Sequence, residues 1–246
     1  MDITFVMLRH VTKQLENSDK IWKCCYNSIR RFYKNKIIII DNNSDYSIIE
    51  NDIELVNCEV IRCNYYNSRL YSPFCQLLDI DFERAIIIHD GVIFQKMVDF
   101  TKFENVKFIW HFDTRQWDDI GRINHQLNSL SNNNSLIDRF NKKQFVGCMG
   151  GCLAITKDFL TKLEDTFMIS KLKNIINNQN DTIAFERTIA ILCFTLYPGL
   201  INDISFEDEI KHMVWGYRYN DYINQINTSS IDLTTKSIIK IFGSRK

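Results

Sequence analysis

The sequence predicts an α/β fold in which a mostly parallel, twisted sheet is flanked by helices on both faces. The apolar run Ile37–Ile40 is β-branched throughout, as is typical of a strand buried on both faces of a parallel sheet. An earlier apolar segment, Ile3–Leu8, has the composition of a first strand. Between the two, apolar residues recur at three- and four-residue spacing, as on one face of a helix: Trp22, Cys25, Ile29 and Phe32. A strand, a helix and a strand in this order form the repeating unit of a parallel sheet.

The same alternation continues along the chain. Further strands are expected at Glu59–Arg62, Ala85–Ile88, Val106–Trp110 and Cys152–Ile155. We expect helices over Leu70–Ile80 and, after the last of these strands, up to about Tyr197. The Asn- and Ser-rich segment Ser129–Ser135 predicts a mobile loop. No linker composition separates two domains, so residues 1–246 are interpreted as a single domain.

Charge and apolar content narrow the classes of function. Lys and Arg number 30, as do Asp and Glu, so the formal net charge is zero and gives no support to nucleic-acid binding. One basic cluster is interpreted as a solvated helix face, with a nucleic-acid binder as its alternative: Arg30, Arg31, Lys34 and Lys36. The N-terminus lacks a signal-peptide pattern, and the longest apolar runs are too short to span a bilayer. Because the eight cysteines include no CxxC pair, we expect reduced thiols in a cytoplasmic protein that is not secreted.

Polar clusters follow three of the expected strands. Asp41–Asp45 comes after the second strand, His89–Gly91 after the fourth and His111–Asp113 after the fifth. In open parallel sheets, ligands bind beyond the carboxyl ends of the strands. The sequence therefore predicts a small-molecule site at this edge of the sheet.

The residues after the first strand bear on how a nucleotide would be held. A dinucleotide-binding fold needs a GxGxxG turn there, but the strand runs into Arg9-His10-Val11-Thr12 without a glycine, and no P-loop occurs. A pyrophosphate would then be bound in another way. The usual alternative is a divalent cation held by carboxylate or imidazole, assisted by basic side chains such as Arg9 and His10.

The second strand and its turn resemble those of a known family. Residues 37–45 read Ile-Ile-Ile-Ile-Asp-Asn-Asn-Ser-Asp and closely resemble the end of the second strand in inverting glycosyltransferases of the GT-A type, near family 2. In that family the aspartate at the strand end contacts the base or ribose of the nucleotide. The resemblance implies this role for Asp41, with Ser44 in the adjoining turn. An Asx turn that closes a strand-to-helix loop is the alternative interpretation.

A second segment is similar to the strand that carries the DxD motif of these enzymes, which binds the metal and the diphosphate. Residues 85–94 read Ala-Ile-Ile-Ile-His-Asp-Gly-Val-Ile-Phe, with a single carboxylate where the family usually has two. The resemblance implies Asp90 as a ligand of Mn²⁺ or Mg²⁺, while His89 would ligate the metal or stack on the base. Ile210–Tyr217 resembles the segment that bears the late histidine of the family, which implies His212 as a second metal ligand.

Two later segments resemble the acceptor side of the family. The stretch Phe145–Ile155 is similar to the glycine-bearing segment that lines the acceptor, where Gly150 and Gly151 would allow close approach to a sugar. A tight turn before a strand is the alternative. The resemblance further implies Glu186 as general base on the acceptor hydroxyl, with Asp181 as second choice. The alternatives are a structural pair of Glu186 with its neighbouring arginine and an N-cap role for Asp181.

The resemblance as a whole implies a glycosyltransferase that moves a sugar from a nucleoside diphosphate donor to a hydroxyl of a glycan or protein acceptor, with inversion. Residues 1–113 would bind the nucleotide-sugar and residues 114–246 the acceptor, and Arg245 and Lys246 resemble a basic tail that closes over the diphosphate. The nearest likeness is to glycosyltransferase-like proteins of large DNA viruses, which implies the host cytoplasm. A homodimer is left open, as is retention of configuration. An inactive GT-A domain that acts as a binding or scaffold module and a sugar nucleotidyltransferase are the alternative functions.

Overall fold

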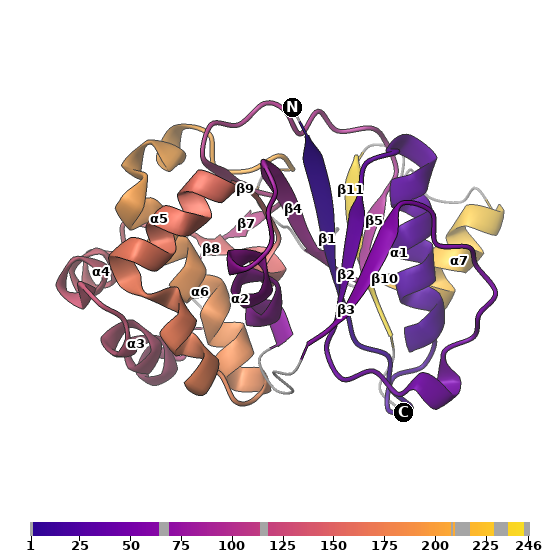
Figure 1. Ribbon diagram of the computed structural model, residues 1–246, viewed down its shortest axis with the longest axis horizontal. Helices are drawn as coiled ribbons and strands as arrows, with labels where there is room; N and C mark the ends of the chain where they lie inside the picture. Colours follow the sequence, from indigo (N-terminus) through magenta and orange to yellow (C-terminus); the bar gives the residue numbers. More distant parts are fainter. Residues whose placement is uncertain are drawn as a thin grey trace.

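The centre of the molecule is a six-stranded sheet with the strand order β3-β2-β1-β4-β9-β6 (Figure 1). The computed structural model describes residues 2–63, 69–113, 118–207, 209, 217–228 and 236–243. The strands are β1 (Ile3–Arg9), β2 (Ile37–Asp41), β3 (Cys58–Arg62), β4 (Arg84–His89), β6 (Val106–Phe108) and β9 (Leu153–Thr156). The pairs β3-β2, β2-β1 and β1-β4 are parallel, whereas β9 runs antiparallel to both β4 and β6. The prediction of a mostly parallel sheet is confirmed.

Helices cover both faces of this sheet (Figure 1). On one face lie α2 (Ser72–Leu78), α5 (Lys157–Phe167) and α6 (Gln179–Leu196), with α3 (Ile120–Ser129) and α4 (Asn133–Asn141) outside them. On the other face lie α1 (Ser18–Phe32), α7 (Tyr219–Thr228) and a three-stranded sheet of β10 (Tyr217–Arg218), β11 (Ile238–Phe242) and β5 (Val92–Phe94). The flanking helices were predicted, and the small sheet was not.

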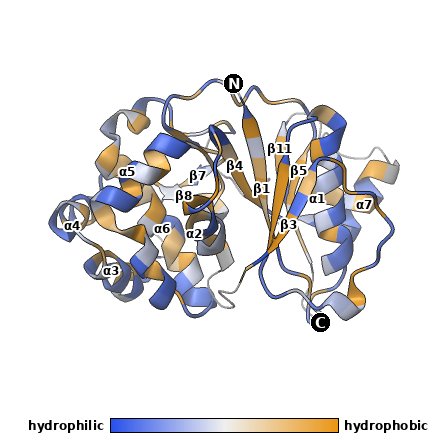
Figure 2. Cartoon of the chain, viewed as in Figure 1, coloured by the Kyte–Doolittle hydropathy of each residue, from blue (hydrophilic) through white to orange (hydrophobic). Residues whose placement is uncertain are grey.

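The alternation of side chains along each strand divides the core in two. Ile38 and Ile40 belong to the apolar cluster under α2, α5 and α6, whereas Ile37 and Ile39 belong to the cluster under α1 and the small sheet. Successive side chains of a strand point to opposite faces, so a continuous isoleucine run serves both clusters. Figure 2 shows hydrophobic residues concentrated in the central strands, and hydrophilic residues along the helices and loops around them.

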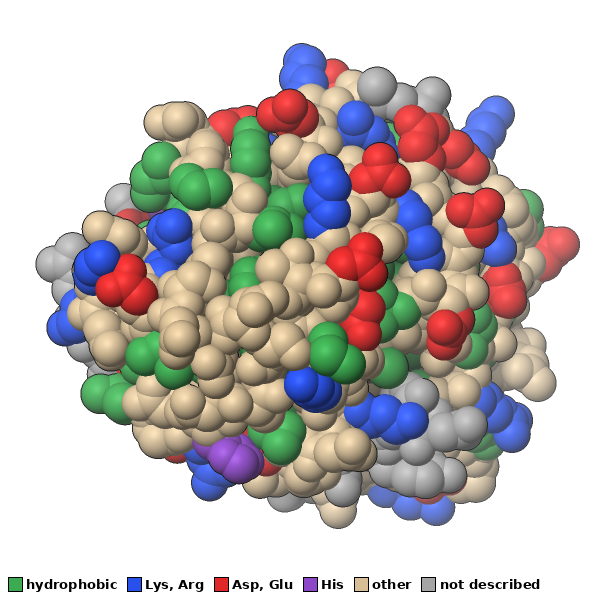
Figure 3. Space-filling view, turned by 60° about the vertical axis from the view of Figure 1, so that its left-hand side comes forward, with side chains coloured by type: hydrophobic (Ala, Val, Ile, Leu, Met, Phe, Trp, Pro, Cys, Tyr) green, Lys and Arg blue, Asp and Glu red, His purple; other side chains and the backbone are tan. Residues whose placement is uncertain are grey.

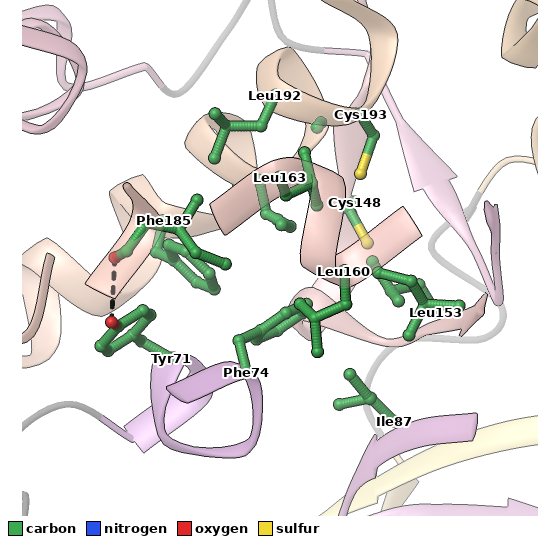
Figure 4. Packing of buried hydrophobic residues seen from close by; sticks show 14 of the residues in the cluster. Tyr71, Phe74, Ile87, Cys148, Leu153, Leu160, Leu163, Phe185, Leu192 and Cys193 are labelled. Atoms are coloured by element: carbon green, nitrogen blue, oxygen red, sulfur yellow. Dashed lines mark hydrogen bonds between the residues drawn. The ribbon is translucent and has the colours of Figure 1, made fainter. Parts of the chain in front are cut away.

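Helix α6 lies at the centre of the first cluster and carries two of the predicted site residues. Thirteen of its 18 residues are buried, so the helix has no wide solvent face. Phe185 packs edge-on against Tyr71 and Phe74, with ring centroids 5.6 and 5.3 Å apart (Figure 4). The Tyr71 hydroxyl donates to the carbonyl oxygen of Ile169 at 2.9 Å, which satisfies its buried polar atom. This packing fixes the position of the carboxylates on α6.

Several local predictions need correction. Ser129–Ser135 is no long loop, because α3 ends at Ser129 and α4 starts at Asn133; Asn132 adopts a left-handed conformation between them, and Leu136 is buried. The strand predicted over Val106–Trp110 ends at Phe108. Asn178, and not Asp181, is the N-cap of α6, since its side chain accepts a hydrogen bond from the Asp181 N–H at 3.0 Å.

The remaining global features concern thiols, membranes and surface charge. All eight cysteines are free, and six of them are buried. No helix within the described ranges is both long and apolar enough to cross a bilayer. On the face shown in Figure 3, acidic and basic side chains are interspersed, and neither sign forms a continuous patch.

Candidate functional site

The ends of β1 and β2 are joined by a buried ion pair. Arg9 and Asp41 are register partners in the two strands, and the Arg9 Nε donates to Asp41 Oδ2 at 2.6 Å. The second oxygen, Asp41 Oδ1, accepts from the Ser44 N–H at 3.1 Å. Both side chains are almost fully buried. Asp41 therefore acts on its surroundings through Arg9, whose guanidinium it orients.

The turn after β1 connects this pair to the end of β4. The Ser44 hydroxyl oxygen accepts from the Val11 N–H at 2.9 Å. The His10 N–H donates to Asp90 Oδ2 at 3.2 Å, and His10 Nδ1 lies 2.7 Å from the carbonyl oxygen of Asn42. Because a carbonyl only accepts, this ring nitrogen carries the proton. The predicted residues Arg9, His10, Asp41, Ser44 and Asp90 are thus brought together at one edge of the sheet.

A cavity of about 380 Å³ opens beyond the ends of β1 and β3. Its walls include two aromatic rings, each with a guanidinium stacked on it. The Arg9 guanidinium carbon lies 4.8 Å from the centroid of Trp22, and that of Arg62 lies 4.3 Å from the centroid of Tyr46. Flat rings next to cations suit the stacking of a planar, electron-rich ligand. Trp22, Tyr46 and Arg62 were not predicted as site residues.

An acidic cluster borders this cavity and is partly neutralised by a buried lysine. Asp19, Glu50 and Asp52 form the one group of carboxylates within the described ranges with the spacing of a metal site. The Lys23 ammonium pairs with Asp19 at 2.5 Å and also with Asp52, although its own side chain is buried. Asp19 and Asp52 are therefore interpreted as the counter-charges of a buried lysine.

His89, at the end of β4, is held as a neutral imidazole. Its Nδ1 accepts from the Gly91 N–H at 3.1 Å. Burial, assisted by the positive charge of Lys240, lowers the pKa of His89 well below its usual range. The single ring proton is then on Nε2, which is buried and has no hydrogen-bond partner among the described residues.

A glycine turn connects Glu186 with His89 at the end of β4. Gly150 and Gly151 have φ values of 64° and 61°, the left-handed region that favours glycine. A Cβ on Gly150 would lie 3.0 Å from Cδ2 of His89, so a side chain there would also crowd the imidazole. The Gly150 N–H donates to Glu186 Oε1 at 2.9 Å, which links the turn to α6.

Glu186 is buried and bonded at both oxygens. Its Oε2 accepts from Arg187 Nη1 at 3.0 Å, and Arg187 Nε donates to Asp118 at 2.9 Å. Burial raises the pKa of Glu186, although Lys240, Arg187 and the Gly150 N–H each act in the opposite direction. A buried carboxylate with a raised pKa is a stronger base than an exposed one. Predicted Glu186, Gly150 and His89 thus form one cluster.

Asp181, the second choice for a base, lies elsewhere. Its Oδ1 accepts from Arg122 Nη1 at 2.5 Å, and its Oδ2 from the Asn177 N–H at 3.1 Å. Its contacts join α6 to α3, away from the glycine turn. The predicted His212, Arg245 and Lys246 lie outside the described residues.

Lys240 is a component of this cluster that sequence reasoning missed. It lies on β11 in register with Val92, two residues after Asp90. Its Nζ is 3.9 Å from the sulfur of Met149, the residue before Gly150. The β-branched run Ile238-Ile239 was the available signal for this strand.

The described residues do not complete a divalent-cation site at the end of β4. Asp90 supplies one carboxylate there, and its Oδ2 already accepts from His10. The Nδ1 atom of His89 accepts a hydrogen bond from the Gly91 N–H. Only Nε2 would then be left to ligate a metal, and Nε2 carries the ring proton. The expected Asp90–His212 metal site remains a prediction, since His212 lies outside the described ranges.

A second cavity, of about 660 Å³, lies beyond the end of β6. Among its lining residues are His111, Asp113, Arg139, Phe145 and Glu209. The His111 ring is fixed by Ser205, whose Oγ is 2.8 Å from Nδ1. The predicted polar cluster His111–Asp113 therefore contributes to a cavity, separate from that of Arg9.

Comparison with solved structures finds glycosyltransferases at low sequence identity. A galactosyltransferase, LgtC, in complex with donor and acceptor sugar analogs is 10% identical, with 98% of this chain and 87% of that chain covered and a TM-score of 0.46. The bifunctional glycosyltransferase WbbM is 10% identical, with 100% of this chain and 46% of that chain covered and a TM-score of 0.47. TarS of S. aureus is 11% identical over 66% of this chain and 49% of its own, at a TM-score of 0.39. No protein-family model and no curated protein matches the chain.

Proposed function

We propose that the chain is a glycosyltransferase that uses a nucleoside diphosphate-sugar. The observation that carries this proposal is the adjacency of two regions at one edge of the sheet. Arg9 lines a cavity with stacked aromatic rings, and the next residue, His10, is bonded to Asp90 beside the cluster of Glu186. A ligand with a planar base at one end and a reacting group at the other matches this arrangement.

The base and ribose would occupy the cavity near Arg9. Stacking of a base on an aromatic ring contributes about 1–3 kcal/mol, and Trp22 and Tyr46 offer such rings. Asp41 and Ser44 would support the donor indirectly, because both oxygens of Asp41 are bonded within the protein. The diphosphate would then lie near Asp90 and the sugar near Gly150 and Gly151.

The proposed chemistry is displacement at the anomeric carbon with inversion. The acceptor hydroxyl oxygen forms a bond to that carbon while the bond from carbon to the β-phosphate oxygen breaks. The bonding electron pair leaves with the diphosphate, and the hydroxyl proton passes to a Glu186 oxygen. Burial keeps Glu186 basic, and the hydrogen bonds from Gly150 and Arg187 fix its orientation. Asp181 is the less favoured base because it pairs with Arg122.

The cavity beyond β6 is proposed as part of the acceptor side. Charged and aromatic side chains in one concave surface, such as Arg139, Asp113 and Phe145, are suited to a hydroxyl-rich glycan. A divalent ion at Asp90 and His212 would neutralise the diphosphate, and the proposal also includes a viral origin and a homodimer.

The test compares Glu186→Gln with Asp181→Asn. Binding is followed by thermal shift with UDP-, GDP-, CMP- and dTDP-sugars, and turnover by release of the nucleotide, with and without a hydroxyl acceptor. Glu186→Gln should lower turnover by about 10²- to 10⁴-fold with donor binding retained. A donor that binds without any turnover in the wild type would identify a binding module instead. Failure of every donor to bind a folded sample would refute the proposal.

A further inference from the structure

The segment between β2 and β3 forms one side of the cavity near Arg9. Glu50 and Asn51 contribute polar side chains to this side. The apolar lining residues of the same segment are Ile49, Ile53 and Leu55. A base is the apolar, planar part of a nucleoside, so it matches this side of the cavity. The volume of about 380 Å³ lies near the lower end of the range for small-molecule sites, roughly 300–1,000 Å³, and suits a base with its ribose.

A flat cationic surface belongs to the same cavity. The guanidinium carbon of Arg62 lies 4.3 Å from the centroid of the Tyr46 ring, and Arg62 is exposed. A base stacks on a guanidinium plane as it does on an aromatic ring, and the cation attracts an electron-rich ring system. Because a purine offers a larger and more electron-rich face than a pyrimidine, this surface favours a purine.

Glu50 differs from the two other carboxylates of its cluster. Asp19 Oδ1 accepts from Trp22 Nε1 at 2.8 Å, and Asp19 Oδ2 pairs with Lys23 at 2.5 Å. Asp52 also pairs with Lys23. One carboxylate oxygen of each of the three residues lies within 4.8 Å of the others, yet within the described ranges no ion pair engages Glu50. The N–H groups of a ligand that donate to Glu50 would reduce the repulsion between these like charges.

The hydrogen-bonding edge of the base decides which base a carboxylate can bind. Guanine presents N1–H and N2–H₂ side by side, and these two donors match the two oxygens of one carboxylate. Uracil presents a single N–H between two carbonyl oxygens, which a carboxylate repels. Adenine and cytosine present one amino group beside an acceptor nitrogen. The side-chain amide of Asn51, the residue after Glu50, can donate to O6 of guanine on the same edge.

We propose that the cavity near Arg9 is specific for guanine, with Glu50 accepting hydrogen bonds from N1–H and N2–H₂, so that the donor is a guanosine diphosphate-sugar. The inference rests on the proposed function, which leaves the base open. Glu50 selects the donor and takes no part in the chemical step, because no bond of the base forms or breaks.

The experiment measures binding of guanosine, inosine and uridine to the full chain by calorimetry. Inosine lacks the N2 amino group of guanosine and keeps N1–H, so the ratio of the two affinities isolates one hydrogen bond to Glu50. Wild type is compared with Glu50→Gln and with the control Glu54→Gln, which changes an exposed carboxylate of the same segment outside the cavity lining.

We expect the wild type to bind guanosine about 10- to 100-fold more tightly than inosine or uridine. In Glu50→Gln the amide turns a donor toward one of the two N–H groups of guanine. The preference for guanosine over inosine should therefore fall to about threefold or less in this variant. Glu54→Gln should keep the preference of the wild type.

Three results would overturn the inference. Uridine binding at least as tight as guanosine binding would assign the cavity to another base and leave the proposed function standing. An equal loss for all three nucleosides in Glu50→Gln, with the preference for guanosine unchanged, would place Glu50 at the ribose or in the folding of its segment. If neither nucleosides nor any nucleoside diphosphate-sugar binds to the folded wild type, the proposed function itself fails, and the specificity for guanine with it.

Discussion

Two regions at the edge of the sheet contain the same kind of buried ion pair, but the groups that surround the pair differ. In each, a buried carboxylate is held by one guanidinium and one backbone N–H: Asp41 by Arg9 and Ser44, and Glu186 by Arg187 and Gly150. At β1 and β2 the pair orients a guanidinium toward an aromatic ring and a cavity. At β4 and α6 the pair lies beside a neutral imidazole and an ammonium, and the pKa of the carboxyl is raised.

The contrast shows how neighbouring groups decide what a buried ion pair does. Arg9 is stacked on Trp22 and lines a cavity. Arg187 stacks on Phe112 at 4.3 Å and is also bonded to the Asp118 carboxylate, so it holds Glu186 in position. In the proposed function, the first region would bind the nucleoside and the second would accept the proton.

The largest effect on stability is expected at the first pair. Arg9→Met would leave Asp41 buried without its cation, which should lower the free energy of unfolding by about 3–5 kcal/mol. Chemical denaturation measures this change. The matched control is Lys13→Met, which removes an exposed pair with Asp45 and should leave the stability unchanged within error. A loss in Arg9→Met no larger than in the control would show that the pair does not hold β1 and β2 together.

The next largest effect on stability is expected at Gly91, where β11 contacts the turn after β4. Gly91→Ala places a methyl group against the backbone of Ile241 and should cost about 3 kcal/mol, because neither strand can move without losing its pairing. Gly121→Ala, in α3, is the control, since its nearest neighbour would be 3.6 Å away. Thermal unfolding compares the two. Equal melting temperatures would contradict the close approach of β11 to Gly91.

A smaller effect is expected from pH. The folded chain keeps His89 neutral, so this residue contributes stability above its ordinary pKa of about 6.5 that is lost as the pH falls. The loss approaches about 1.4 kcal/mol per pH unit, because the unfolded chain binds a proton that the folded chain does not. His89→Asn keeps an acceptor for Gly91 and should flatten this dependence between pH 6.5 and 5 in denaturation curves. Parallel curves for both proteins would show that His89 is not the group responsible.

The smallest effect on stability is expected in the cavity near Arg9. Tyr46→Leu should change the free energy of unfolding by less than about 0.5 kcal/mol, since Tyr46 is 43% exposed. Nucleoside binding, measured by calorimetry, should nevertheless weaken by about 1–3 kcal/mol. Tyr197→Leu, whose ring lies outside this cavity, should leave nucleoside binding intact. Unchanged affinity in Tyr46→Leu would remove the stacking surface from the proposal.

Features that depend on residues close together in the sequence could be predicted, whereas features that depend on distant residues could not. The strand at Ile37–Ile40 and its polar turn could be predicted because a β-branched run followed by Asp41 carries both signals within nine residues. Trp22 was recognised as part of an apolar helix face, but the same face also borders a cavity, which periodicity does not reveal. Lys240 could not be placed, because its position depends on pairing with a strand about 150 residues earlier.

The predictions from polar segments were wrong because tertiary contacts and backbone geometry, and not composition, decide their structure. Ser129–Ser135 has the composition of a loop, yet the burial of Leu136 by tertiary contacts makes Asn133 the start of a helix. At α6, Asn178 and Asp181 are equally good caps by composition, and only the backbone geometry decides between them.

The pairing of β5 with β11 also sets the order in which the protein can become competent during translation. The residues of the first region, up to Arg62, are made early and are close in sequence. Lys240 is added 150 positions after Asp90, which at roughly 5–20 residues per second is a delay of about 8–30 s. A growing chain can thus form the cavity near Arg9 while the cluster around Glu186 still lacks its ammonium. Under the proposed function, the nucleoside-binding region would therefore be complete before the region proposed to carry the reaction.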